Sequence, residues 1–307
     1  MKYILFILLL STSLFSYTNE TIAQDTLVQN YWPHGAIKEN LNYSNGQLNG
    51  WQEYYYETGV LKSKRYYSAG VQKGKQYDYY ETGVVQEIFE KDGDRFVAEH
   101  LSYYPSGALR ERTPYLNGKV EGFVTVTSET GEVIARYSFK GGKRDGYGYE
   151  YYPGGKLKVV AYFENDMQSD TTKWYYESGV MKGEYLYKEG YLHGRAIEYF
   201  ETGVVSAHLF NRFDKSDSVQ TYYYPSGKIK SVVNFTRGNK TDIAKTYYEN
   251  GKLWTEQNYV KNQLDGESKI FREDGTLWYS DMYSKGQLIK STEYDEKGHL
   301  PKKQVSE

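Results

Sequence analysis

The residues of this chain most able to do chemistry are its histidines and carboxylates, so their spacing was considered first. A metal site built from histidines needs two of them close together on one element. The five histidines lie far apart, at His34, His100, His193, His208 and His299. We interpret His193, in the segment YLHG, as a solvated turn residue rather than a metal ligand.

The carboxylates recur too regularly to indicate a catalytic pair. Glycosidases place two carboxylates across the scissile bond, but one column of glutamates here repeats along the whole chain, which predicts solvated hairpin tips. That column contains Glu57, Glu81, Glu129, Glu177, Glu201, Glu249 and Glu273. Asp92 with Asp94, and Asp214 with Asp217, lack the full run of oxygen ligands that Ca²⁺ needs.

Other catalytic patterns are also incomplete. The segments Gly146-Tyr147-Gly148 and Gly141-Gly142-Lys143 lack the strand–loop–helix setting of a phosphate cradle. Serines and threonines near turns have no nearby histidine and acid partners. The chain has no cysteine, which excludes disulfides, thiolate ligands and cysteine nucleophiles. We predict no enzyme activity, no catalytic residues, no cofactor and no metal.

Composition favours a β-rich protein that does not bind nucleic acid. The 307 residues include 36 Tyr and 30 Gly but only 6 Pro, and the formal net charge is −2. Tyrosine is enriched in strands. A nucleic-acid binder would usually carry a strong basic excess.

The N-terminus has the features of an export signal. Lys2 precedes an apolar run from Tyr3 to Phe15, and small residues lead to Ala23. The run is shorter than the ~20 residues of a spanning helix, so we favour a cleaved signal peptide over residues 1–23 and keep a membrane anchor as the alternative. We expect the periplasm, outer-membrane association or secretion.

One glycine recurs every 24 residues along almost the whole chain, and we call it the repeat glycine. A fixed period of 20–50 residues indicates a repeat architecture. An aliphatic residue follows two positions later, and an aromatic residue eight positions later in nine of eleven units. The even spacing puts both on one face of a strand. The repeat glycines are Gly35, Gly59, Gly83, Gly107, Gly131, Gly155, Gly179, Gly203, Gly227, Gly251 and Gly275.

Each unit contains two turn signals. The repeat glycine ends a Pro/Glu–polar–Gly segment that is typical of a type I turn closed by a left-handed residue. Eleven positions later only Gly, Asn or Asp occurs, which predicts a second left-handed turn residue. We assign a structural turn role to Gly59, Gly83, Gly107, Gly155, Gly179, Gly203, Gly227 and Gly251.

The predicted fold is all-β: an elongated, twisted antiparallel meander of about eleven 24-residue β-hairpin repeats, without helices after the signal segment. The repeat array covers residues 31–298, with some 22 strands, between a linker at 24–30 and a flexible tail at 299–307. In the units of Gly83 and Gly203 we expect slipped or bulged second turns, with Phe89 and Phe210 taking the aromatic role.

Two aromatic residues precede most repeat glycines and predict ladders of rings along both faces of the sheet. Such ladders favour a non-catalytic protein-binding or scaffold module. A glycan- or cell-envelope-binding module and peripheral membrane association are the alternatives. The candidate binding surface is Tyr55, Tyr79, Tyr103, Tyr151, Tyr175, Tyr199, Tyr223 and Tyr247.

The segments YSNGQLNG (43–50), YLNGKVEG (115–122), YKEGYLHG (187–194) and YVKNQLDG (259–266) resemble the MORN repeat variant of bacterial proteins labelled YwqK-family antitoxins. The resemblance covers residues ~31 to 298. It implies a sheet of successive hairpins and a binding or scaffolding role, and its label suggests an antitoxin- or immunity-like neutraliser. It supplies no catalytic residues.

The turn assignment predicts unequal effects of two neighbouring substitutions. Gly179→Val should destabilise the fold by more than ~1 kcal/mol, because a β-branched residue fits poorly at positive φ. Ser178→Thr should be nearly silent. Thermal melts that show the two variants equally stable would contradict the left-handed assignment.

Overall fold

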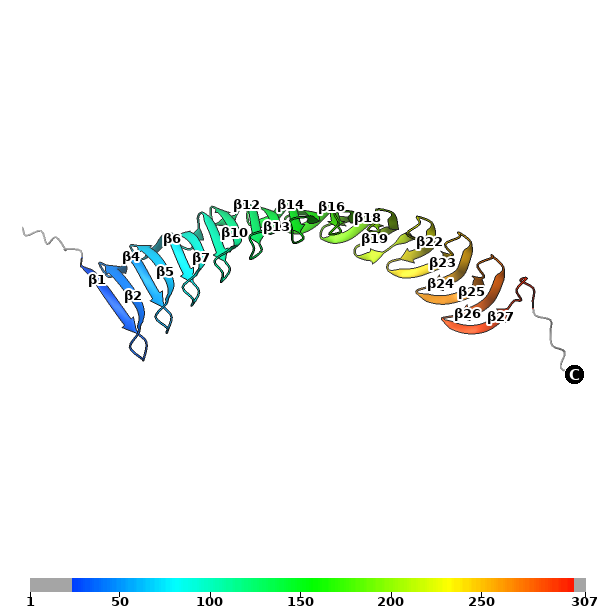
Figure 1. The fold of residues 1–307 in the computed structure, drawn as a ribbon, viewed down its shortest axis with the longest axis horizontal. Helices are drawn as coiled ribbons and strands as arrows, with labels where there is room; N and C mark the ends of the chain where they lie inside the picture. The colour runs from blue at the N-terminus through cyan, green and yellow to red at the C-terminus, as the bar shows by residue number, and fades with distance from the viewer. Residues whose placement is uncertain (1–23, 301–307) are drawn as a thin grey trace, which may run out of the picture.

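Successive antiparallel strands build the part of the chain that the structure describes. A computed structural model describes residues 24–300, and in it every strand pairs with its neighbours in sequence, as β4, β5, β6 and β7 do. The strands form one continuous sheet that runs as an elongated, arched ribbon from the N-terminal to the C-terminal end (Figure 1). The predicted all-β hairpin meander is confirmed, and no helix occurs between residues 24 and 300.

The sheet has 27 strand segments, and four strands are each divided in two by a short irregularity (β3–β4, β8–β9, β11–β12 and β20–β21), so 23 continuous strands result. Their bounds are β1 (Asp25–Tyr31), β2 (Ile37–Ser44), β3 (Gln47–Leu48), β4 (Gly50–Tyr55), β5 (Leu61–Ser68), β6 (Val71–Tyr79), β7 (Val85–Asp92), β8 (Arg95–Phe96), β9 (Glu99–Tyr103), β10 (Leu109–Leu116), β11 (Lys119–Val120), β12 (Gly122–Thr127), β13 (Val133–Lys140) and β14 (Lys143–Tyr151). The second half has β15 (Leu157–Glu164), β16 (Met167–Tyr175), β17 (Met181–Lys188), β18 (Tyr191–Tyr199), β19 (Val205–Arg212), β20 (Lys215–Ser216), β21 (Ser218–Tyr223), β22 (Ile229–Thr236), β23 (Asn239–Tyr247), β24 (Leu253–Val260), β25 (Gln263–Phe271), β26 (Leu277–Ser284) and β27 (Gln287–Glu293).

The segment expected to be a linker is a strand. Residues 25–31 form β1, which pairs with β2 from Asp25↔Ser44 to Tyr31↔Ile37. The prediction of a linker at 24–30 was wrong because these residues have the same repeat phase as β4 and β6 and find the same kind of partner in β2. The proposed signal segment, 1–23, and most of the proposed tail, 301–307, lie outside the described residues.

The first turn of each unit has the predicted geometry. At the first of the eight assigned glycines, the Gly59 N–H donates to the Tyr56 carbonyl at 2.9 Å and closes a four-residue turn. The eight assigned turn glycines have φ between +77° and +92°. Ten of the eleven second-turn residues also have positive φ, and Asp94 is the exception. The residue before each of them, as at Gly93 with φ +63°, is left-handed in all eleven units, so in ten units the second turn has two successive left-handed residues where the sequence predicted one.

The second turns of the two irregular units are not slipped. Asp92 pairs with Arg95, and Arg212 pairs with Lys215, in the same phase as the other units. Phe89 is buried on the face where the missing aromatic would lie. Asn211 occupies the aromatic position of its own unit and is buried there, so Phe210, one residue away, points to the opposite face.

The most deeply buried column of the sheet lies seventeen residues after each repeat glycine, and we call the face that carries it the packed face. Its side chains are small or amide-bearing. Gln76 is 0% exposed and bridges a register irregularity between β5 and β6: its Oε1 accepts from the Tyr66 N–H at 2.9 Å, and its Nε2 donates to the Gly74 carbonyl at 2.9 Å. A buried amide thus replaces main-chain bonds that the irregular register cannot form. The buried members are Gln52, Gln76, Gly148, Thr172, Ala196, Gln220, Ala244 and Ser268.

The second aromatic of each doublet ties one repeat to the next. The Tyr56 hydroxyl donates to the Tyr79 carbonyl at 2.8 Å. In seven units the tyrosine hydroxyl donates in this way to the carbonyl of the residue 23 positions later, at 2.7–2.9 Å. In the last unit the Arg272 guanidinium donates instead to the Asp295 carbonyl at 2.8 Å. The tyrosine donors are Tyr56, Tyr80, Tyr104, Tyr152, Tyr176, Tyr224 and Tyr248.

Removing one of these hydroxyls should loosen the contact between two repeats. Tyr152→Phe should lower stability by about 1 kcal/mol, because the Tyr175 carbonyl loses its donor. Phe200 stands at the equivalent position without a hydroxyl, so Phe200→Tyr should raise stability by a similar amount. The midpoint of urea unfolding measures both changes. Shifts of the same sign in the two variants would contradict a stabilising role for these hydroxyl hydrogen bonds between repeats.

Candidate functional site

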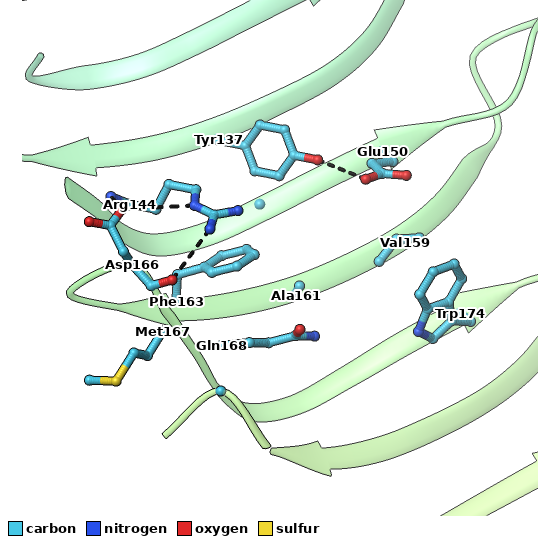
Figure 2. A pocket seen from close by; sticks show the side chains of 12 residues that line it. Tyr137, Arg144, Glu150, Val159, Ala161, Phe163, Asp166, Met167, Gln168 and Trp174 are labelled. Carbon is cyan, nitrogen blue, oxygen red and sulfur yellow. Dashed lines mark hydrogen bonds and ion pairs between the residues drawn. The ribbon is translucent and has the colours of Figure 1, made fainter. Parts of the chain in front are cut away.

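An open hollow of about 430 Å³ lies on the packed face over β13–β16 (Figure 2). Its floor is the buried cluster of Val159, Ala161 and Phe163 from β15, with Tyr137 and Trp174 packed against it. Three aromatic rings and two short aliphatic side chains therefore surround one depression. No other group of buried apolar residues in the described part of the chain has this extent.

The hollow forms where the buried column has no side chain. Gly148 stands at the position that Gln76 fills three repeats earlier. A Cβ at Gly148 would come within 2.6 Å of the Tyr137 ring and 3.1 Å of the Phe163 ring. The glycine therefore lets both rings lie close to the backbone. Ala161 on the next strand leaves further space above the floor.

One side of the hollow carries a tyrosine–carboxylate pair. The Tyr137 hydroxyl donates to Glu150 Oε1 at 2.7 Å, and the Lys158 ammonium donates to Glu150 Oε2 at 3.4 Å. Burial, and then the hydrogen bond and negative charge of Glu150, raise the pKa of Tyr137 to about 12. At neutral pH the phenol is a firm hydrogen-bond donor beside an apolar floor.

The other side carries an ion pair, in which Arg144 Nε lies 3.9 Å from Asp166 Oδ1. The Arg144 guanidinium lies over the Phe163 ring at 4.4 Å and donates to the Asp166 carbonyl at 3.3 Å. Figure 2 shows Arg144 and Glu150 on different sides of the hollow, with the aromatic floor between them. Gln168 lies at the rim and donates to the Thr172 hydroxyl at 2.6 Å.

This arrangement suits binding by shape and hydrogen bonding. The rings offer apolar surface, while Glu150 and Arg144 offer charges of opposite sign at separate places. Between residues 24 and 300 no group of three or more His, Asp or Glu side chains could hold a metal ion. The same residues contain no helix long and apolar enough to cross a membrane.

The eight predicted binding tyrosines do not line the hollow. They are all half-buried and lie one per repeat on the face opposite the packed face, where Tyr55 donates to Glu53 Oε2 at 2.8 Å and Tyr223 contacts His208 Nδ1 at 3.0 Å. Five of these tyrosines also accept the hydrogen bonds that join one repeat to the next. Their carbonyls accept from the tyrosine hydroxyls of the preceding repeat, at Tyr79, Tyr103, Tyr175, Tyr199 and Tyr247.

Other residues considered from the sequence have structural surroundings. The glutamate column lies at exposed hairpin turns. His193 is not in a turn: it belongs to β18 and packs its ring against Phe213, with ring centroids 4.6 Å apart. That interpretation was wrong because the turn lies earlier, at Glu189 and Gly190.

Sequence reasoning missed Tyr137, Glu150 and Trp174. The sequence did contain one signal. In this unit a tyrosine six residues after the repeat glycine is followed by a glutamate thirteen residues later. The same spacing recurs at Tyr185 and Glu198, where the Tyr185 hydroxyl donates to Glu198 Oε1 at 3.0 Å. There too, burial and the charge of Glu198 raise the tyrosine pKa. The glycine that opens the hollow appeared in the sequence only as part of Gly-Tyr-Gly.

A family model described as MORN repeat variant matches five segments of the chain, at residues 48–69, 144–165, 171–189, 217–236 and 243–261. The chain carries MORN-variant repeats. The second matched segment includes Arg144, Gly148, Glu150 and Phe163, so a MORN-variant repeat supplies much of the hollow. No curated protein matches the chain. The similarity to YwqK-family antitoxins is therefore not supported by any curated relative.

Several solved structures show a weak likeness to these repeats. A crystal structure of TcdB2-TccC3 is 13% identical, with 88% of this chain and 18% of that chain covered and a TM-score of 0.19. The structure of TcdB2-TccC3-Cdc42 is 14% identical, with 90% and 17% covered and a TM-score of 0.19. A Photorhabdus luminescens Tc holotoxin pore is 15% identical, with 89% and 18% covered and a TM-score of 0.17. The chain thus spans less than a fifth of their length.

The raised pKa of Tyr137 predicts a difference in alkaline stability. The folded state holds the phenol proton above the unfolded value of 10, so its contribution is complete below pH 10 and is lost as the pH rises to about 12. Tyr137→Phe should therefore lose stability less steeply than the parent between pH 10 and 12. Tyr147→Phe, at an exposed ring, is the control. Urea unfolding across this range measures the slopes, and parallel slopes for Tyr137→Phe and the parent would contradict the assignment.

Proposed function

We propose that the chain is an exported, non-catalytic binding protein whose partner is another protein and whose binding site is the hollow over β13–β16. The observation that carries the proposal is the aromatic floor of Tyr137, Phe163 and Trp174 between groups of opposite charge. Aromatic residues and arginine are enriched at the centres of protein interfaces.

The chemistry of the hollow favours a protein segment with one apolar side chain between polar neighbours. An apolar group would cover Phe163 and Trp174. A basic neighbour would meet Glu150 and an acidic one would meet Arg144, so the two charges would set the orientation of the bound segment. The long row of repeats beside the hollow offers further contact surface, as is usual for repeat proteins.

A glycan- or envelope-binding role is the second candidate, and a different surface favours it. Three residues after the repeat glycine most units carry a cation, as in Lys62 or Lys182, which lies over the tyrosine before the turn. The last two units carry Trp254 and Trp278 there, and both rings are exposed. Two such rings one repeat, or about 9.5 Å, apart offer stacking platforms for an extended sugar chain.

Export and the antitoxin-like alternative remain part of this proposal. The N-terminal sequence supports export to the periplasm, the outer membrane or the medium. An immunity-like role would require a toxin partner in the same compartment, and a protein-binding hollow would serve it equally well. Nucleic acid is not expected as a partner, given the nearly balanced charge.

Capture of the partner tests the proposal. The full chain, immobilised and incubated with envelope extract, should retain one protein in stoichiometric yield. Met167→Glu, at the exposed rim of the hollow, should reduce capture at least about tenfold, because a charge at the mouth of an apolar site must be desolvated on binding. Met282→Glu is the matched control, since Met167 is 47% exposed and Met282 is 44% exposed.

Different outcomes separate the candidates. Equal capture by both methionine variants would contradict the hollow as the site. Retention on polysaccharide resin that is lost in Trp254→Ala and Trp278→Ala, without protein capture, would favour the glycan candidate. Flotation with liposomes would favour a membrane surface, and turnover of a hydrolase substrate would contradict a non-catalytic role.

A further inference from the structure

The N-terminal edge of the sheet has the form of an interrupted repeat. β1 has the phase of the second strand of a hairpin, equivalent to β4 and β6, and pairs on one side with β2. The first strand of that hairpin would lie on its other side. All seven residues of β1 are exposed.

The buried column continues into this open edge. Val28 stands seventeen residues after the position where a repeat glycine would fall, so it belongs to the column of Gln52 and Gln76. Those side chains are 0% exposed, whereas Val28 is 37% exposed and its neighbour Leu27 is 55% exposed. A further strand would bury Val28 as neighbouring strands bury the rest of the column.

Between residues 24 and 300 no strand lies on that other side of β1. At the other end of the array the chain reverses after β27 through a turn in which the Gly298 N–H donates to the Asp295 carbonyl at 2.9 Å. Among the described strands β27 also pairs on one side only, but it carries Lys290 and Glu293, the kind of charged residues that protect an exposed edge.

Strand polarity decides how two copies can meet. The array contains 23 continuous strands that alternate in direction, so its first and last strands run the same way. Joining β27 of one copy to β1 of the next would place parallel strands in an antiparallel sheet. Joining β1 to β1 through a two-fold axis keeps the antiparallel order.

We propose that the β1 edge is a self-association surface, at which β1 of two copies pairs antiparallel to form a two-fold dimer. Full overlap of the seven-residue strands places Val28 opposite Val28. The segment DTLVQNY has one charged residue, no proline and no lysine, so it lacks the usual protection of an exposed edge. The dimer would join two ribbons into one sheet and present two copies of the hollow.

Single cysteines test the register, because the chain has no cysteine of its own. In the dimer the two Val28 Cα atoms would lie about 4.5–5.5 Å apart, within disulfide range. Val28→Cys should therefore crosslink with itself on mild oxidation. Thr26→Cys and Asn30→Cys should each remain uncrosslinked alone and should crosslink when mixed. Equal crosslinking at all three positions would indicate parallel strands, and no crosslinking at any position would overturn the proposal.

Charge exchange tests the same contact in solution. Val28→Lys and Val28→Glu each place like charges opposite one another, so each variant should be a monomer by light scattering where the parent is a dimer. Association should be at least about tenfold weaker in each variant than in the parent. An equimolar mixture of the two should dimerise again. Leu288→Lys, on exposed β27, is the control and should stay dimeric.

The experiment uses the full chain purified after export, with its N-terminus read by mass spectrometry. A monomeric parent, a dimeric Val28→Lys variant, or loss of the dimer in Leu288→Lys would each overturn the proposal. The dimer does not depend on the proposed protein partner, and capture by the hollow can fail while the β1 contact holds.

Discussion

Hydrogen bonding from side chains to the main chain, within a repeat and to the next repeat, is the interaction on which this structure depends. A single sheet has no second layer to pack against, and few of its apolar residues are fully buried. The tyrosine hydroxyls reach the carbonyls of the next repeat, and buried amides such as Gln76 satisfy the main chain at irregular positions. Each bond is modest, but its recurrence couples every repeat to the next.

The candidate site arises from a departure from that repeat. Most units fill the buried column with an amide or a small side chain, but Gly148 leaves it open, and the rings of Tyr137 and Phe163 occupy the space. A repeat protein can thus build a local site by changing one column in one unit while its neighbours hold the backbone in place. The same logic applies at the C-terminal end, where tryptophans replace the usual lysines at Trp254 and Trp278.

The ends of the array follow from the same requirement. An interior strand has its buried column covered on both sides, and a terminal strand does not. At β1 the uncovered position carries Val28, an apolar residue that an added strand would shield. In the described part of the chain the ribbon is complete in its middle and unpaired at its two terminal strands, so the proposed self-association at β1 and the proposed partner binding at the hollow would use separate surfaces.

The sequence by itself determined the all-β hairpin repeat and the position of its turns, because glycine at a left-handed position and alternation along a strand are local constraints that a fixed period makes visible. It did not determine which aromatic residues line the hollow: the eight tyrosines chosen from the doublets lie on the face opposite it. Tyr137, Glu150 and Trp174 belong to three different strands, and which of their side chains meet depends on how those strands pair in the sheet. Tertiary structure also decided that residues 25–31 are a strand, because that outcome depends on the partner that β2 provides.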